Sequence, residues 1–358
     1  MATNHSHRLL DQLGMTVPII QAPMAGVSSP AMAAAVSESG GMGSLGVGAM
    51  NAAKAREAIH QFRKKNTGPL NVNVFVHQPA RANAQKEAAW IERLRPQFER
   101  VGAAPPAALH EIYTSFLSDS DMLAMLVEER PKAVSFHFGL PPRPQVEALH
   151  SAGIVLLATA TNLDEAKAIE AAGIDAIVAQ GYEAGGHRGM FDPDVEDSRL
   201  GTLALTRVLV QQVGLPVIAA GGIMDGAAIA AALSLGASAV QMGTAFIATD
   251  ESLADAGYRE RLFSDAAYHT IMTRAISGRP ARSLANDFTR LGSVVSDDSI
   301  PDYPTAYDAG KALNAAGKAA GQTGYGAQWA GQGAPLARAM PTRALMQALK
   351  SELDQALS

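Results

Sequence analysis

The sequence contains no cysteine among its 358 residues. This absence excludes disulfide bonds, thiolate metal sites, iron–sulfur clusters and a cysteine nucleophile. The chain also lacks an apolar run long enough to span a bilayer, and its N-terminus, MATNHSHRLLDQLG, lacks the apolar segment of a signal peptide. The sequence therefore predicts a cytoplasmic protein that does not enter a membrane.

An excess of positive charge is missing as well. The formal net charge is −5 and the pI is about 6.0, whereas proteins that bind nucleic acids usually present a basic face. The sequence thus predicts no nucleic-acid partner. Hydrophobic residues make up 47% of the chain and charged residues 18%, a balance typical of a globular protein with a substantial core. This length allows one large domain with an appendage, or two domains.

Short apolar runs alternate with alanine-rich helical runs along the chain. Most of the apolar runs are continuous rather than alternating, which indicates strands buried on both faces. Eight βα units within about 250 residues predict a TIM (βα)8 barrel. A doubly wound sheet is the alternative, but it would not need eight such units. The eight runs are residues 18–26, 43–50, 70–77, 132–139, 154–162, 176–181, 215–222 and 239–246.

Two segments do not fit the repeat. Residues 78–131 are too long for one barrel helix and are interpreted as an insertion. Residues 251–358 follow the eighth strand and are rich in alanine and glycine. They could be helices joined by loose linkers, or a lid over the barrel. Long excursions in compact domains are often active-site elements, so we expect a barrel over residues 1–250 and a smaller, mainly helical lid or substrate-binding segment after it.

The active site of a TIM barrel lies where its strands end, and the loops after strands seven and eight usually hold phosphate. Gly221 and Gly222 follow the seventh run, and Gln241, Met242, Gly243 and Thr244 end the eighth. Glycine backbones can direct N–H groups at an anion. Asp225 is expected to cap the helix behind the seventh strand. Glycines in one loop could simply turn the chain, but both loops together favour a phosphate site.

Two amide side chains indicate which kind of phosphate-bearing ligand the site would bind. Asn73 and Gln180 lie in or at the end of apolar strands, and each amide offers donors and acceptors. A flavin pyrimidine edge needs this mixture, although a single buried amide often binds only backbone. Two such amides near QAPMAG (21–26) favour flavin mononucleotide (FMN).

The stretch AQGYEAGGHRG (179–189) places His187 directly after Gly185 and Gly186. Two glycines make a bare stretch of backbone, which we expect to close on a ligand. A histidine there can take a proton or bind an anion, because its unperturbed pKa lies near neutrality. The alternative is a structural histidine that shapes the loop.

These motifs, with PIIQAPMAG, NVNVF, PVIAAGG and QMGTAF, resemble the nitronate monooxygenases, formerly called 2-nitropropane dioxygenases, of the bacterial class I type. The resemblance extends over roughly the whole chain, and AQGxEAGGH is its most specific part. It implies a TIM barrel with a smaller lid, a tightly held FMN, and oxidation of alkyl nitronates with O2 to a carbonyl compound and nitrite or nitrate. Propionate 3-nitronate is the substrate that the family implies.

The resemblance also implies roles for individual residues. His187 would be the catalytic histidine, while His137 could instead be a core histidine and Lys311 could be solvated. No metal site is expected, and the assembly would be a monomer or a homodimer. The implied substrate-pocket residues are Tyr113, His137, Tyr303 and Lys311. The implied FMN contacts are Ala22, Pro23, Met24, Asn73, Gln180, Gly185, Gly186, Gly221, Gly222, Gln241, Met242, Gly243 and Thr244.

Other flavin barrels share the GGH loop. Flavin-dependent enoyl-acyl-carrier-protein reductases and NADH:quinone reductases are the main alternatives, and the former usually carry glutamate where Gln180 stands. No GxGxxG after an early strand offers a dinucleotide site. The stretch GMGSLGVG (41–48) has glycines, but a lone glycine-rich turn is weak evidence for such a site. IMP dehydrogenase-like barrels need the cysteine that this chain lacks. A non-catalytic flavin-binding module is disfavoured by the polar residues gathered at one face.

Overall fold

Eight parallel strands form the centre of the molecule. The structure, a computed structural model, describes residues 2–358. The strands lie in the order β1-β9-β8-β6-β5-β4-β3-β2, and a bridge between Ile20 and Met42 closes the barrel. The predicted TIM barrel is therefore confirmed. Its strands are β1 (Ile19–Gln21), β2 (Gly43–Gly46), β3 (Leu70–Phe75), β4 (Ala133–His137), β5 (Val155–Ala160), β6 (Ala176–Gln180), β8 (Val217–Ala220) and β9 (Ala239–Met242).

A ring of helices surrounds the barrel. Short polar side chains begin several of them by accepting a backbone N–H from the first turn, as N-caps do. The predicted cap is confirmed, since Asp225 Oδ1 accepts from the Ala228 N–H at 2.9 Å. The ring consists of α2 (Pro30–Glu38), α3 (Ala52–Arg63), α5 (Ser120–Glu129), α6 (Arg143–Ser151), α7 (Leu163–Ala171), α8 (Thr202–Gln212), α9 (Gly226–Ser234) and α13 (Thr342–Leu357).

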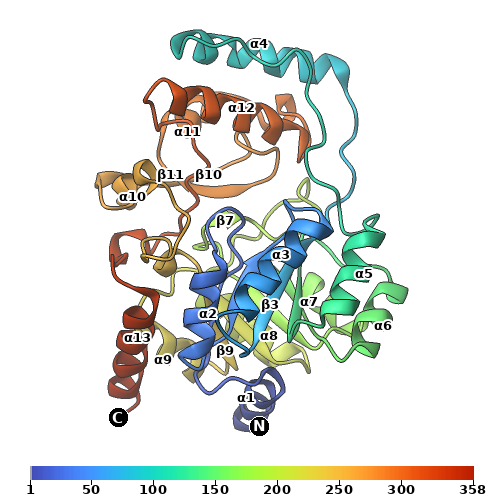
Figure 1. Ribbon diagram of the computed structural model, residues 1–358, viewed down its shortest axis with the longest axis vertical. Coiled ribbons are helices and arrows are strands. Elements are labelled where there is room, and N and C mark those ends of the chain that lie inside the picture. Colours follow the sequence, from blue (N-terminus) through green and yellow to red (C-terminus); the bar gives the residue numbers. More distant parts are fainter. Residues whose placement is uncertain (1) are drawn as a thin grey trace.

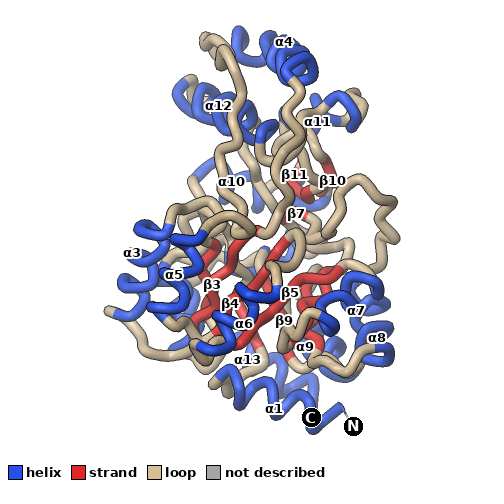
Figure 2. The backbone as a smooth tube through the Cα atoms, turned by 90° about the vertical axis from the view of Figure 1, so that its right-hand side faces the viewer, coloured by secondary structure: helices blue, strands red, loops and turns tan. Residues whose placement is uncertain are grey.

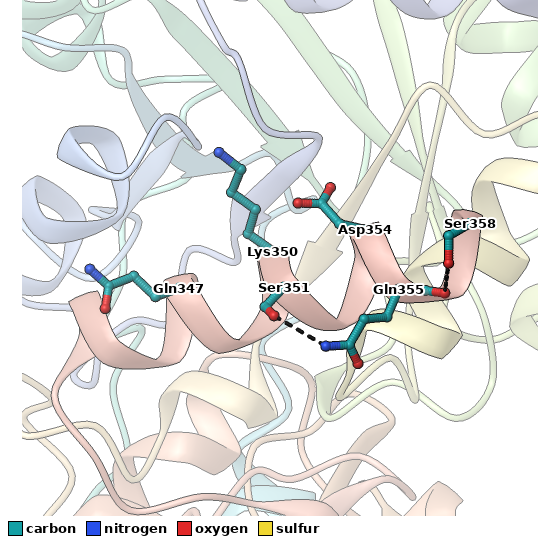
Figure 3. Close-up of a pocket in the computed structure, with 6 residues that line it drawn as sticks. All are labelled: Gln347, Lys350, Ser351, Asp354, Gln355 and Ser358. Carbon is teal, nitrogen blue, oxygen red and sulfur yellow. Dashed lines mark hydrogen bonds between the residues drawn. The ribbon is translucent and has the colours of Figure 1, made fainter.

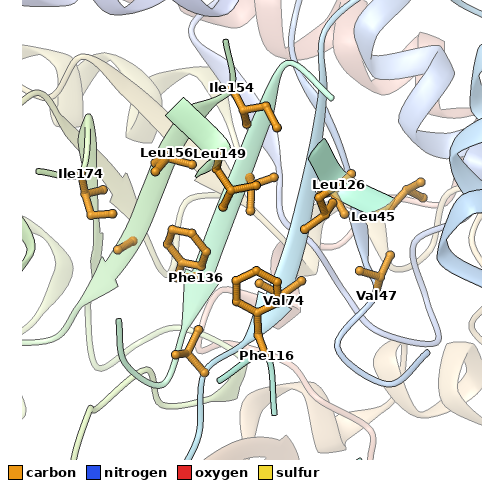
Figure 4. Packing of buried hydrophobic residues seen from close by; sticks show 14 of the residues in the cluster. Leu45, Val47, Val74, Phe116, Leu126, Phe136, Leu149, Ile154, Leu156 and Ile174 are labelled. Atoms are coloured by element: carbon orange, nitrogen blue, oxygen red, sulfur yellow. The ribbon is translucent and has the colours of Figure 1, made fainter. Parts of the chain in front are cut away.

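Both faces of the strands are buried, which explains their continuous apolar sequences. Along β5, Leu156 points into the layer between strands and helices, where Phe136 also packs (Figure 4). Its neighbours Val155 and Leu157 belong to the separate cluster that fills the barrel interior. Helix α1 (Ala2–Leu13) contributes the fully buried Leu13 to that interior cluster, and it lies at the end of the barrel opposite the lid (Figure 1).

The lid is assembled from two distant parts of the sequence. Trp90 and Leu94 of the insertion pack in one core with Phe288 and Leu313 of the later segment, and these elements stand above the barrel (Figures 1 and 2). A small sheet of β10, β11 and β7 ties the lid to a barrel loop. The elements outside the barrel are α4 (Ala84–Arg100), β7 (Gly186–His187), η1 (Thr244–Phe246), α10 (Ala256–Leu262), η2 (Asp265–Tyr268), β10 (Thr270–Thr273), β11 (Ala281–Leu284), α11 (Asp287–Gly292), η3 (Asp297–Ser299), α12 (Thr305–Ala319) and η4 (Ala334–Leu336).

Parts of the expected insertion and of the expected lid pack against the barrel in the structure. Helix α5, inside the expected insertion 78–131, packs against α3 and α6 of the ring. Helix α13, inside the expected lid 251–358, packs between α9 and α2. Strand β9 is followed only by the short η1, so α13 occupies the position of the eighth barrel helix and buries Leu345 and Leu349 there. Between residues 2 and 358, no helix is long and apolar enough to cross a membrane.

Candidate active site

A cavity of about 370 Å³ lies at the carboxyl ends of the barrel strands, beneath the lid. This volume falls in the range of small-molecule sites. Every site residue proposed from the sequence lines it, together with residues that the sequence did not single out, including Tyr258, Tyr307, Trp329, Gly331 and Gly333. A second, shallow depression lies on the outer face of α13 (Figure 3). Unlike the cavity beneath the lid, it is lined only by exposed residues from the C-terminal end of the chain.

Unpaired backbone donors gather at one end of the cavity. Among residues 2–358, the N–H groups of Gly222, Gly243 and Thr244 have no hydrogen-bond acceptor, although all three residues line the cavity. Gly222 has a φ of +70°, a conformation that glycine adopts readily. These groups stand in the loops after β8 and β9, so the geometry matches an anion site formed by backbone amides.

The two amides expected to face a flavin differ in their contacts. Asn73 donates from Nδ2 to the Ser135 carbonyl and hydroxyl, each at 3.0 Å, and its Oδ1 accepts from no described residue. Gln180 instead binds backbone at both ends: Nε2 donates to the His187 carbonyl at 2.9 Å, and Oε1 accepts from the Gly189 N–H at 2.7 Å. These two contacts tie Gln180 to the GGH loop, while its expected contact with FMN stays a prediction.

The GGH loop is held by the lid. Its residues Gly186 and His187 form β7 and pair with Arg282 and Ala281 of β11. A Cβ at Gly185 would lie 2.5 Å from the backbone nitrogen of Gly331. The backbone of Gly331 therefore approaches Gly185 closely, and only a residue without a side chain fits there.

Two charged residues beside the loop have structural contacts. The Glu183 carboxylate accepts from the Thr202 N–H at 2.8 Å and from the Thr202 hydroxyl at 3.0 Å, so it caps α8. Arg188 is buried, forms two hydrogen bonds with Asp197 at 2.8 and 3.0 Å, and donates to the Gln180 carbonyl. These contacts leave His187 as the ionisable side chain of the loop that lines the cavity.

His187 is enclosed by other rings and by the Ser277 hydroxyl. Its Nε2 lies 2.8 Å from Ser277 Oγ, and its ring centroid is 5.1 Å from that of Trp329 and 5.4 Å from that of Tyr303. Desolvation, together with the nearby His137 and the Arg279 guanidinium, lowers the pKa of His187 to about 3. The ring is therefore neutral at neutral pH and can accept a proton.

His137 lines the cavity, but both of its nitrogens bind protein. Nδ1 lies 3.0 Å from Thr159 Oγ1, and Nε2 lies 3.1 Å from the His187 carbonyl. A carbonyl only accepts, so Nε2 carries the hydrogen and Nδ1 accepts from the Thr159 hydroxyl. Desolvation by burial lowers the pKa of His137 to about 4. These contacts favour a core histidine bonded to backbone over the substrate contact that the sequence suggested.

Tyrosines and one lysine form the wall of the cavity on the lid side. The Lys311 Nζ lies 4.9 Å from the ring centroid of Tyr113 and 5.6 Å from that of Tyr307. Burial lowers the pKa of Lys311 and raises that of Tyr307 to about 12. The Tyr303 hydroxyl is buried without a partner among the described residues. The wall therefore presents neutral O–H donors beside an amine, a combination suited to an anion.

Sequence reasoning missed several residues of the cavity. Tyr307 stands four residues before Lys311 on α12, a spacing that places both on one helix face, and this spacing could have identified it. Gly331 and Gly333 lie in the glycine-rich tail, whose composition alone suggested linkers. Ser277 precedes β11 and carries no local signal, because its contact with His187 spans 90 residues.

The closed barrel, with a lined cavity at the carboxyl ends of its strands, defines a TIM-barrel enzyme whose lid completes the active site. Residues 6–352 match the family model of nitronate monooxygenase. The chain belongs to this family and is a flavin-dependent oxidoreductase that oxidises nitronates. The resemblance seen in the motifs is thereby confirmed.

Individual relatives agree with this assignment. A nitronate monooxygenase of Paraburkholderia phytofirmans is 60% identical, covering 98% of this chain and 95% of the relative. One of Pseudomonas aeruginosa is 53% identical, covering 95% and 97%. Among solved structures, a nitroalkane oxidase from Streptomyces ansochromogenes is similar with a TM-score of 0.88 and 39% identity, covering 98% of both chains. FabK from Thermotoga maritima has a TM-score of 0.74 and 29% identity, covering 98% and 96%.

Proposed function

We propose that the chain binds FMN and uses O2 to convert alkyl nitronates into a carbonyl compound and nitrite or nitrate. The observation that carries this proposal is a single cavity that has one group of anion-binding residues in the barrel loops and a second group on the lid side. The backbone N–H groups of Gly222, Gly243 and Thr244, in the loops after β8 and β9, have no acceptor among the described residues. On the lid side, the Lys311 amine lies over the rings of Tyr113 and Tyr307. A phosphate and an anionic substrate fit these two groups of residues.

The donors present in the cavity fit FMN. The three free N–H groups would hold its phosphate, and the free Asn73 Oδ1 would accept from a ring N–H. Bound FMN would supply the redox chemistry with the nitronate and oxygen, while the protein supplies position and electrostatics.

The chain's own residues would bind and orient the substrate. Lys311 and Tyr303 line the cavity, where they would attract and orient an anion. His187, neutral at neutral pH, would accept the α-proton of a neutral nitroalkane, whereas a nitronate is already deprotonated and offers the ring no proton to accept. The surrounding rings exclude water from this region, which strengthens each of these contacts.

Turnover should need no nicotinamide. We expect the purified holoenzyme to consume oxygen with nitronates alone, because the nitronate is itself the electron donor. The measurement is oxygen uptake over a panel of nitronates, propionate 3-nitronate included, with and without NADH. In parallel, NADH is added anaerobically and the flavin absorbance is followed. Flavin bleaching by NADH at a rate comparable with nitronate turnover would favour a reductase of the FabK type instead.

Lys311 should recognise a carboxylate on the substrate. Replacing Lys311 with methionine removes the amine but keeps an unbranched side chain beside Tyr113 and Tyr307. We expect the KM for propionate 3-nitronate to rise roughly tenfold or more, the effect of losing a hydrogen bond to a charged group. The KM for an uncharged-chain nitronate such as ethylnitronate should rise less.

The matched control for this prediction is Lys318→Met on the same helix. Lys318 pairs with Asp255 at 2.6 Å and does not line the cavity, so this variant should keep the KM for both substrates. Equal increases for both nitronates in Lys311→Met would show that Lys311 attracts the nitronate group itself and does not bind a carboxylate.

A further inference from the structure

Ser277 is the one hydrogen-bond partner of the His187 ring among residues 2–358. Its Oγ lies 2.8 Å from His187 Nε2, and the serine is fully buried. The other ring nitrogen, Nδ1, has no partner in the described chain and is not among its buried unpartnered atoms. Nδ1 is thus the nitrogen that remains accessible in the cavity.

The donors and acceptors around Ser277 determine the direction of this hydrogen bond. The Ser277 hydroxyl also lies 3.3 Å from the Arg279 carbonyl, and the Arg279 N–H approaches Oγ at 3.5 Å. A serine hydroxyl has one hydrogen to donate. The Arg279 carbonyl has no other donor among the described residues. If Ser277 donated to His187, this carbonyl would stay unpaired, which is costly for a buried backbone group.

The alternative arrangement satisfies every group. Ser277 donates its hydrogen to the Arg279 carbonyl and accepts from His187 Nε2–H. His187 then carries its hydrogen on Nε2, and Nδ1 presents a bare lone pair to the cavity. Only this tautomer offers a proton acceptor to a substrate.

The segment that carries Ser277 is held rigidly. Gly278 has a φ of +92°, and a Cβ there would lie 2.5 Å from the Tyr303 nitrogen. The buried Arg279 guanidinium stacks 4.4 Å from the Phe138 ring centroid and donates to the Met190 carbonyl. These contacts anchor the segment both to the tyrosine wall and to the chain just after the GGH loop, so the hydroxyl keeps its place.

We propose that Ser277 is a positioning residue that holds His187 in the Nε2–H tautomer and thereby makes Nδ1 the proton-accepting atom of the active site. The catalytic part of this inference rests on the proposed function. The tautomer itself does not depend on turnover, so the two can fail separately.

The tautomer can be measured directly in the FMN-loaded enzyme. The chain has nine histidines, and long-range ¹H–¹⁵N correlation spectra of ¹⁵N-histidine-labelled protein distinguish the protonated from the bare nitrogen of each ring. The His187 signals are assigned by their absence in His187→Asn. We expect a protonated Nε2 and a bare Nδ1. A protonated Nδ1 in the wild-type protein would overturn the proposal.

Ser277→Ala tests the functional consequence. The variant should retain FMN, add a population of the Nδ1–H tautomer, and oxidise nitroethane roughly threefold to tenfold more slowly, the effect of one hydrogen bond. Oxidation of ethylnitronate, which needs no base, should change less. Ser277→Thr keeps the hydroxyl and should restore the wild-type tautomer. Equal losses with both substrates, or an unchanged tautomer in Ser277→Ala, would overturn the proposal. If nitronates are not oxidised at all, the spectra still decide whether Ser277 sets the tautomer.

Discussion

Replacing His187 with asparagine is expected to abolish most oxidation of neutral nitroalkanes while part of the nitronate activity survives. A neutral nitroalkane must lose its α-proton before it can be oxidised, and a positioned base contributes about 10²–10⁴-fold to such a step. A nitronate arrives deprotonated and needs no base, so the variant loses only the packing contacts by which the ring positions the substrate. Asparagine keeps a polar group and removes the titration.

The depressed pKa of His187 defines the pH range of this effect. Because the pKa is lowered to about 3, the neutral, proton-accepting ring is present throughout the range above pH 4. The base form is lost only as the pH falls through about 3, so His187 should add no step to the activity profile between pH 6 and 8. Such a low pKa makes a weak base, but negative charge developing on the nitroalkane raises the ring's proton affinity during the reaction.

Oxygen uptake with nitroethane and with ethylnitronate at one pH, with FMN occupancy checked, measures the difference. The control is His269→Asn, because His269 is exposed and lies outside the cavity. Equal losses with FMN retained would make His187 a binding residue rather than a base. An unchanged rate with both substrates would show that His187 has only a structural role in the GGH loop.

Gly222→Asp is expected to release FMN and, with it, nearly all activity. The substitution places a carboxylate beside the free N–H groups of Gly222, Gly243 and Thr244, where it would compete with the phosphate and repel it. Wild-type protein should be yellow, and chromatography of the heat-released supernatant should identify FMN. The variant should be colourless at the same protein concentration. A wild-type supernatant without FMN would refute the cofactor assignment.

Two further variants separate charge from backbone strain. Gly222 has a φ of +70°, and a Cβ there would lie 3.3 Å from the Glu183 Cβ. Gly222→Asn has the same shape without the charge, and asparagine tolerates this conformation about as well as aspartate does. It should retain more FMN. Gly173→Asp introduces the same residue at a φ of +77° in open space, and it should retain FMN fully. Equal FMN loss in Gly222→Asn and Gly222→Asp would assign the effect to side-chain size or backbone strain and not to charge.

The sequence alone determined the barrel and the face on which the candidate site residues lie. Most of the eight strands can be predicted from a continuous apolar run, which occurs because both faces of the strand are buried. The cap at Asp225 is equally local, since it depends on one side chain and the next turn of helix. The residues at the strand ends, including Gly222, Asn73 and His187, follow from these strands, because parallel strands bring their carboxyl ends to one face.

Only the tertiary structure decided which elements pair across long distances. The apolar faces of α4, α5 and α13 are visible in the sequence, but an apolar face does not specify its partner. Helix α5 packs in the ring around the barrel, and α4 packs in the lid. Helix α13 occupies the ring position after β9, where the chain forms no barrel helix directly. Hydrophobic burial is non-directional, so these choices depend on the geometry of the whole chain.

The contacts of the individual site residues also depend on the fold of the whole chain. Gln180 and Asn73 are alike in sequence, yet the folded loop uses both ends of one amide and leaves the oxygen of the other free. Gly185 admits the backbone of Gly331, 146 positions further along the chain. Ser277 meets His187 across 90 residues. A hydrogen bond requires two groups within about 3 Å, and only the folded chain brings residues so distant in sequence to that separation.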